Sequence, residues 1–172
     1  MTEYIRLLIL LLENSEIVTL EYWSEFILGI QRDEFNRHPA LQERFGNLRI
    51  PSLFHLRLRG MWWVGKLEEW HLQVQGFPMK GSDPISPEAP LQASVLMTIL
   101  GNRISAARVN EQSDLLLNLT DGRSITVQGI GGKWEENWFL ELPVDDPARD
   151  KWSIVCDSQG TIGGTFPAPT NA

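Results

Sequence analysis

The hydrophobic and polar positions in the first part of the chain follow the pattern of α-helices. Residues 3–13 are apolar on nearly every side, which predicts a mostly buried helix. Residues 20–35 predict a second helix with a wide apolar face. That face consists of Trp23, Phe26, Ile27 and Ile30, and the opposite face carries Glu21, Glu25, Asp33 and Glu34. A third, short helix is expected to follow Pro39 and to end at Gly46, because glycine suits a helix C-cap.

The period then changes to that of β-strands. In residues 52–60, apolar and polar side chains alternate, which predicts a strand with a basic outer face. Residues 68–76 show the same alternation and predict a second strand, with Trp70, Leu72 and Val74 directed inward. Residues 60–66 between them form either a wide turn or a short extra strand. Adjacent side chains on a strand face opposite ways, so at most one of Trp62 and Trp63 is expected to enter the core with Trp70.

Residues 76–90 are rich in proline, glycine and serine and are expected to form a linker or a long loop. This segment suggests a division of the chain into an N-terminal part, residues 1–75, with helices followed by a β-hairpin, and a β-domain over residues 91–166. Residues 167–172 are expected to be a flexible tail.

The C-terminal part begins with a predicted short helix over residues 91–100 that ends at Gly101. Five or six antiparallel strands are then expected, with turns at the spacing of a sandwich or barrel. Asp121-Gly122 between two apolar runs predicts a hairpin with a type I′ turn, which needs positive φ at both central residues. Trp138, Trp152 and Cys156 are expected to face inward. The predicted fold class is α+β, with an N-terminal helical part packed on an antiparallel β-sheet or a partly open β-barrel.

Composition and charge narrow the functional classes. The chain of 172 residues is 42% hydrophobic and carries a net charge of −7, with a sequence pI near 5.0. An acidic surface repels nucleic acid and steers towards basic partners. The apolar run Leu7–Leu12 is too short for a secretory signal or a membrane span, and a single cysteine, Cys156, fits a reducing compartment. We therefore expect a cytoplasmic protein that binds neither nucleic acid nor membranes.

No motif for catalysis or cofactor binding is present, and we expect no cofactor, no metal and no enzymatic activity. Cys156 is most simply a small buried residue, since no histidine lies in its half of the chain. His55 and His71 could form a metal site with Glu69 if their strands were paired, but two solvated histidines are the simpler interpretation. A hydrolase that uses Glu135 or Glu136 is a third hypothesis.

A stretch without acidic residues runs from Arg44 to Leu67. It carries Arg44, Arg49, Arg57, Arg59 and Lys66, with His55 between them. Two interpretations remain open: the basic stretch interacts with acidic residues within the chain, or it binds a partner. Arginine and tryptophan are enriched at interface hot spots. The residues expected to bind a partner are His55, Arg57, Arg59, Trp62, Trp63, Glu135 and Glu136.

The C-terminal strands also carry a resemblance. The segment "ILGNRISAARVNEQSDLLLNLTDGRSITVQG…WFLELP…KWSIVCDSQGTI" resembles small bacterial β-domains that occur among the immunity proteins of polymorphic toxin systems. It covers residues 99–165 and transfers no catalytic residue. The resemblance implies a non-enzymatic protein that binds and neutralises a toxin, and the acidic charge suits a basic toxin domain. The alternative is a β-domain that binds a small molecule or carbohydrate through Trp62, Trp63, Trp134 and Trp138.

Overall fold

The computed structural model describes residues 1–33, 38–77 and 88–168, and it confirms the α+β fold class. The helices are α1 (Glu3–Leu12), α2 (Pro39–Phe45), α3 (Leu67–Gly76) and α4 (Glu88–Ile99), with a 3-10 turn η1 (Arg149–Lys151). The strands are β1 (Glu16–Tyr22), β2 (Phe26–Gln31), β3 (Leu53–Leu58), β4 (Trp62–Val64), β5 (Ile104–Val109), β6 (Leu115–Leu119), β7 (Ser124–Val127), β8 (Glu136–Glu141), β9 (Ser153–Asp157) and β10 (Ile162–Thr165).

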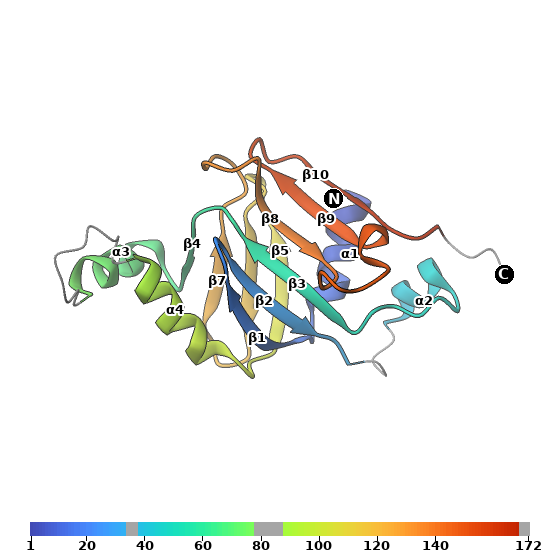
Figure 1. The fold of residues 1–172 in the computed structure, drawn as a ribbon, viewed down its shortest axis with the longest axis horizontal. Helices are drawn as coiled ribbons and strands as arrows, with labels where there is room; N and C mark the ends of the chain where they lie inside the picture. Colours follow the sequence, from blue (N-terminus) through green and yellow to red (C-terminus); the bar gives the residue numbers. More distant parts are fainter. Residues whose placement is uncertain (34–37, 78–87, 169–172) are drawn as a thin grey trace.

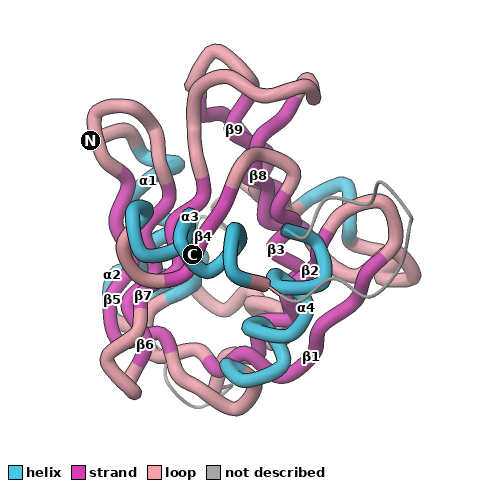
Figure 2. Tube along the Cα trace, turned by 90° about the vertical axis from the view of Figure 1, so that its left-hand side faces the viewer, coloured by secondary structure: helices cyan, strands magenta, loops and turns pink. Residues whose placement is uncertain are grey.

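The strands form two antiparallel sheets that enclose one core. The larger sheet has the order β1-β2-β3-β8-β9-β10, and the smaller has the order β4-β7-β6-β5. Figure 1 shows the larger sheet in front of the smaller one, and the turned view of Figure 2 shows the same two layers edge-on. Each sheet combines strands from both sides of residues 76–90, so the two parts of the chain share a single core. Of the predicted linker, residues 78–87 lie outside the described part, as do residues 169–172 of the predicted tail.

Helices cover the ends of this sandwich. Helix α1 packs against β5 and β10 through the buried side chains of Leu7, Leu8, Leu11 and Leu12. Thr2 caps its first turn by accepting a hydrogen bond from the Ile5 amide. Helices α3 and α4 lie together at one end of the sheets, and α2 lies at the other (Figure 1). Within the described residues, no helix has the length and apolar character needed to cross a membrane.

The predicted second helix is wrong, because residues 16–31 form the β1–β2 hairpin. Strand β2 is buried along five of its six residues, so its side chains are apolar on both faces. A continuous apolar run of this length fits a buried strand as well as a helix, and the spacing of Phe26, Ile27 and Ile30 does not distinguish the two. Gly29 lies in β2, and the hairpin leaves no room for a larger residue there, because a Cβ would lie 2.0 Å from the Thr19 hydroxyl oxygen.

The predicted strand over residues 68–76 is also wrong, because these residues form α3. Trp70 is buried as expected, but Leu72 is 68% exposed. Trp70 and Val74 are four residues apart and therefore share one face of a helix, whereas Leu72 falls on the opposite side. The acidic residues Glu68 and Glu69 lie in the first turn, where they interact favourably with the helix dipole.

The other predicted elements are confirmed, with one difference in a turn. Helices α1, α2 and α4 form, and Trp138, Trp152 and Cys156 are buried. The β6–β7 hairpin forms at Asp121-Gly122, but only Gly122 has positive φ, at 90°, and the Gly122 amide donates to the Leu119 carbonyl. This loop closed by a left-handed glycine replaces the expected type I′ turn.

Two adjacent glycines of the edge strand β10 provide a test of its packing. A Cβ on Gly164 would lie 2.1 Å from the Ser153 carbonyl oxygen, whereas a Cβ on Gly163 would have no atom within 4 Å. We expect Gly164→Ala to lower the free energy of unfolding by about 1–3 kcal/mol, the usual cost of overpacking. Gly163→Ala should have little effect. Urea unfolding of both variants measures the difference, and equal stabilities would contradict the close approach of β10 to β9.

Candidate functional site

A groove opens on the surface at the end of the larger sheet. The β1–β2 turn, the end of β3 and strand β4 form one side, and the start of α4 and residues 132–134 form the other. Its volume is about 380 Å³. We call it the aromatic groove. The lining residues that matter for its chemistry are Tyr22, Glu25, Arg59, Met61, Trp62 and Trp134.

Large apolar side chains are exposed along this groove. Tyr22 is 62% exposed and Trp134 is 50% exposed. Trp23, in the turn beside Tyr22, is 75% exposed, and Met61 is 42% exposed. A single exposed apolar residue is ordinary, but a contiguous exposed patch marks an interaction surface. The groove therefore has the composition of a protein-binding or ligand-binding site.

A set of arginine and glutamate side chains borders the groove. We call it the Arg–Glu network: Glu25, Arg57, Arg59, Glu136, Glu141 and Arg149. Arg57 donates to Glu25 and to Glu141, each over 2.6 Å. Arg59 also donates to Glu25, and it lies 2.5 Å from Glu136. Three elements thus meet in one polar layer: the β1–β2 turn, the end of β3 and strand β8.

The ring of Phe139 packs against two arginines of the network. The guanidinium carbon of Arg57 lies 5.3 Å from the ring centroid, and that of Arg59 lies 4.8 Å from it. Phe139 pairs with Arg57 across β3 and β8, so the sheet register sets this contact. Arg149 in η1 completes the far end with a bond of 2.7 Å to Glu141. Cation–π contacts and shared carboxylates give these arginines fixed orientations.

The ionisation of Glu25 argues against a role for this carboxyl as a general acid. Burial of Glu25 opposes its ionisation, but hydrogen bonds from Arg59 and Arg57 outweigh that effect and hold the pKa of its carboxyl below the ordinary value. A carboxyl that acts as a general acid needs a raised pKa instead. Burial also lowers the pKa of His55, and nearby Glu21 offsets this only in part. His55 is therefore favoured in its neutral form.

The structure distributes the sequence-predicted site residues over several environments. His55 is 9% exposed, and Arg57 belongs to the network. Arg59 and Trp62 line the groove, but Trp62 is only 2% exposed and packs edge-on against Phe26 at 5.3 Å. Both arginines therefore bind acids within the chain, which favours the intramolecular interpretation of the basic stretch.

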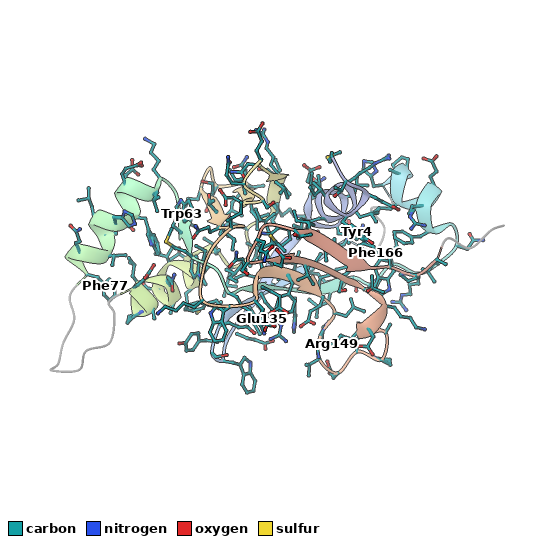
Figure 3. The ribbon with its side chains drawn as sticks, turned by 90° about the horizontal axis from the view of Figure 1, so that it is seen from above. Tyr4, Trp63, Phe77, Glu135, Arg149 and Phe166 are labelled. Carbon is teal, nitrogen blue, oxygen red and sulfur yellow. The ribbon has the colours of Figure 1, made fainter. Side chains whose placement is uncertain are left out.

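The remaining predicted residues lie outside the groove lining. Trp63 is partly buried against the core, so Trp62 is the tryptophan of the pair that points fully inward. Glu135 is exposed, and Glu136 is bound to Arg59. Figure 3 shows Trp63 well apart from Glu135 and from Arg149. Trp138 is fully buried and does not contribute to a ligand surface.

Two proposed chemistries lose their geometric basis. Glu69 and His71 lie on helix α3 and not on a strand beside His55, so the premise of a metal site is wrong. No group of three metal-ligating side chains occurs in the part of the chain that the structure describes. Cys156 is a buried side chain as predicted, and burial raises the pKa of its thiol to about 12. The thiol is therefore protonated at neutral pH.

Sequence reasoning missed Tyr22, Trp23, Glu25 and Met61. The helical pattern of residues 20–35 hides the first three, because it gives no sign that they lie at the tip of a hairpin. Ser24, between two runs rich in β-branched and aromatic residues, was the available turn signal. Without the hairpin, Tyr22 could not be placed in one groove with Trp134.

Comparisons with protein-family models, with curated proteins and with solved structures found no match for this chain.

Proposed function

We propose that this chain is a non-enzymatic protein-binding protein whose docking surface is the aromatic groove together with Trp23. The observation that carries the proposal is the pair of exposed aromatic side chains, Tyr22 and Trp134, in one groove, with the exposed Trp23 next to Tyr22 in the hairpin turn. Tryptophan and tyrosine provide large contact areas and dominate interface hot spots. The adjacent Arg–Glu network offers a pre-organised polar rim, since its side chains are already held in place.

The proposed partner is a basic protein. The chain carries a net charge of −7, and the exposed Glu135 follows Trp134 of the groove in the sequence. Such charge steers a basic partner and accelerates its association at low salt. Together with the resemblance of residues 99–165, this supports the more specific proposal of an immunity protein that neutralises a basic toxin domain. The single cysteine is in keeping with an encounter in the cytoplasm.

Affinity capture with three forms of the protein tests the proposal. The baits are the wild type, the double variant Trp23→Ala/Trp134→Ala, and a control, Leu72→Ala/Met97→Ala. Leu72 and Met97 are 68% and 61% exposed and lie outside the groove lining, so the control removes exposed apolar side chains from another part of the surface. From native-host lysate at low salt, the wild type and the control should retain one stoichiometric basic protein that the groove variant does not. Retention by all three baits, or by none, would contradict the proposal.

A second candidate function, binding of a small molecule or carbohydrate, is favoured by the size of the groove. Its volume of about 380 Å³ falls within the range of small-molecule sites, roughly 300–1,000 Å³. Trp62 and Trp134 both line it. A fluorescence screen with sugars and apolar ligands separates the two functions. A saturable response that Trp134→Ala abolishes, with no protein captured, would favour the small ligand.

A further inference from the structure

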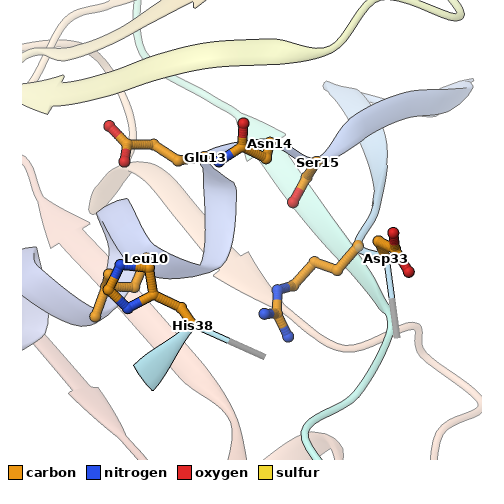
Figure 4. A pocket seen from close by; sticks show the side chains of 7 residues that line it. Leu10, Glu13, Asn14, Ser15, Asp33 and His38 are labelled. Atoms are coloured by element: carbon orange, nitrogen blue, oxygen red, sulfur yellow. The ribbon is translucent and has the colours of Figure 1, made fainter. Parts of the chain in front are cut away.

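A second, smaller cavity lies where the end of α1, the residues after β2 and the start of α2 meet (Figure 4). Its volume is about 40 Å³. Polar side chains dominate its lining: Glu13, Asn14, Ser15, Arg32, Asp33 and His38. The aromatic groove shares none of these residues, so the cavity is a separate site.

Arg32 is the unusual member of this cavity. Its side chain lines the cavity, yet the residue is only 9% exposed. Its backbone amide donates to the Ser52 carbonyl, but in the described part of the chain no carboxylate forms an ion pair with its guanidinium. Arg57, Arg59 and Arg149 differ, since each is bound to glutamate. A nearly buried charge without a counter-ion is costly, so an anion that supplied one would bind favourably.

The two acidic residues of the cavity do not compensate this charge. Figure 4 shows the carboxylates of Glu13 and Asp33 directed away from the middle of the cavity, towards opposite sides. Glu13 accepts a hydrogen bond from the Ala107 amide, which holds it in that position. Burial lowers the pKa of the Arg32 side chain, and among the described residues no carboxylate raises it again. The guanidinium of Arg32 is therefore the cationic group that an anion in the cavity would meet.

Neighbouring groups add a hydrogen-bond donor. His38 accepts a bond from the Ala40 amide at its Nδ1 atom, so the neutral ring carries its proton on Nε2. The Ser15 hydroxyl donates its hydrogen to the Leu11 carbonyl, so towards the cavity it can only accept a hydrogen bond. Asn14, with positive φ of 63°, turns the chain at the mouth and contributes an amide group.

We propose that this cavity binds a small carboxylate, held by the guanidinium of Arg32. The planar fork of donors in arginine matches the two oxygens of a carboxylate. A volume of about 40 Å³ suits a group of three heavy atoms, because one water-sized site needs roughly 10–15 Å³. His38 and Asn14 lie at the opening, where a carboxylate on a longer molecule would enter.

Thermal unfolding in sodium formate tests the proposal. The comparison buffer is sodium chloride of equal ionic strength, and the variants are Arg32→Gln and a control, Arg108→Gln, whose arginine is exposed on β5. Formate at ten times its Kd should raise the Tm of the wild type and the control by about 2–6 °C, and should not raise that of Arg32→Gln. Equal shifts in all three proteins, or none in the wild type, would overturn the proposal.

A second variant covers the case in which Arg32→Gln does not fold. Arg32→Lys keeps the charge but loses the fork, and it should weaken formate binding at least tenfold in an NMR titration. Unchanged binding would overturn the role of the guanidinium. Parallel titrations with formate and with N-acetyl-aspartate amide distinguish the sources of the carboxylate. Binding of formate alone assigns a free anion, and binding of both assigns a carboxylate side chain of a protein.

Discussion

Replacement of Trp138 by alanine is expected to lower the free energy of unfolding by about 3–5 kcal/mol, the usual cost of removing a large aromatic side chain from a core. Trp138 is completely buried in β8, opposite Leu58 on one neighbouring strand and Cys156 on the other. Its indole nitrogen donates to the Ser113 carbonyl, 3.1 Å away, just before β6 of the other sheet. The side chain therefore both fills the space between the sheets and joins them through a hydrogen bond.

Chemical unfolding followed by circular dichroism measures this loss. Trp134→Ala is the matched control, since it removes the same side chain from a position that is 50% exposed. It should change stability by less than about 1 kcal/mol, as surface substitutions usually do. Similar losses in the two variants would show that Trp138 does not join the sheets in this way.

The second large effect is expected for Glu25→Gln. Glu25 is 8% exposed and accepts hydrogen bonds from both Arg57 and Arg59. Removing its charge leaves two partly buried guanidinium groups short of a counter-ion, which costs about 3–5 kcal/mol when one partner of a buried ion pair is lost. Glu136 and Glu141 remain bound to these arginines, so the lower end of that range is expected.

The effect of Glu25→Gln should depend on pH in a defined direction. The pKa of Glu25 lies below its ordinary value of 4.5 in the folded protein, so the folded state binds fewer protons than the unfolded state. Its contribution to stability is fully present above pH 4.5 and is lost as the pH falls through the folded pKa. The stability difference between the wild type and Glu25→Gln should therefore stay constant from pH 7 to about pH 4.5 and shrink below it.

The control for this experiment is Glu21→Gln in the same hairpin. The Glu21 carboxylate is 41% exposed and lies 3.8 Å from the imidazole of His55. Because the Glu21 carboxylate is partly exposed and His55 favours its neutral form, this pair contributes at most about 1 kcal/mol. A loss for Glu25→Gln no larger than that of Glu21→Gln, or one that grows towards acidic pH, would contradict the role assigned to the network.

Elements with one buried face were predictable from the sequence. In β6 and β9, buried side chains such as Leu115, Leu117 and Ile154 alternate with less buried ones, and this produces a clear period of two. Strand β2 lacks that signal because it is buried on both faces. The sequence of α3 has the alternation of a strand because Trp70, Leu72 and Val74 are spaced two residues apart. Only tertiary contacts decide which of them is buried.

The site was predictable only in part, for a related reason. The basic stretch identified Arg57 and Arg59, because an absence of acidic residues over many positions is visible in the sequence. Their partners are not visible, since Glu25 lies 32 positions from Arg57 and Glu141 lies 84 positions from it. Such pairs depend on strand order, which local patterns do not encode. The exposure of Tyr22 and Trp23 likewise follows from their place at a hairpin tip.

The affinity of the captured partner for groove variants tests the central claim most directly. Isothermal titration of that partner into the wild type, into Trp23→Ala/Trp134→Ala and into the control Leu72→Ala/Met97→Ala provides three dissociation constants. If the aromatic groove is the docking surface, the groove variant should bind at least about 30-fold more weakly, as expected for the loss of hot-spot residues. The control should bind like the wild type. Equal affinities for all three proteins would show that the partner docks elsewhere.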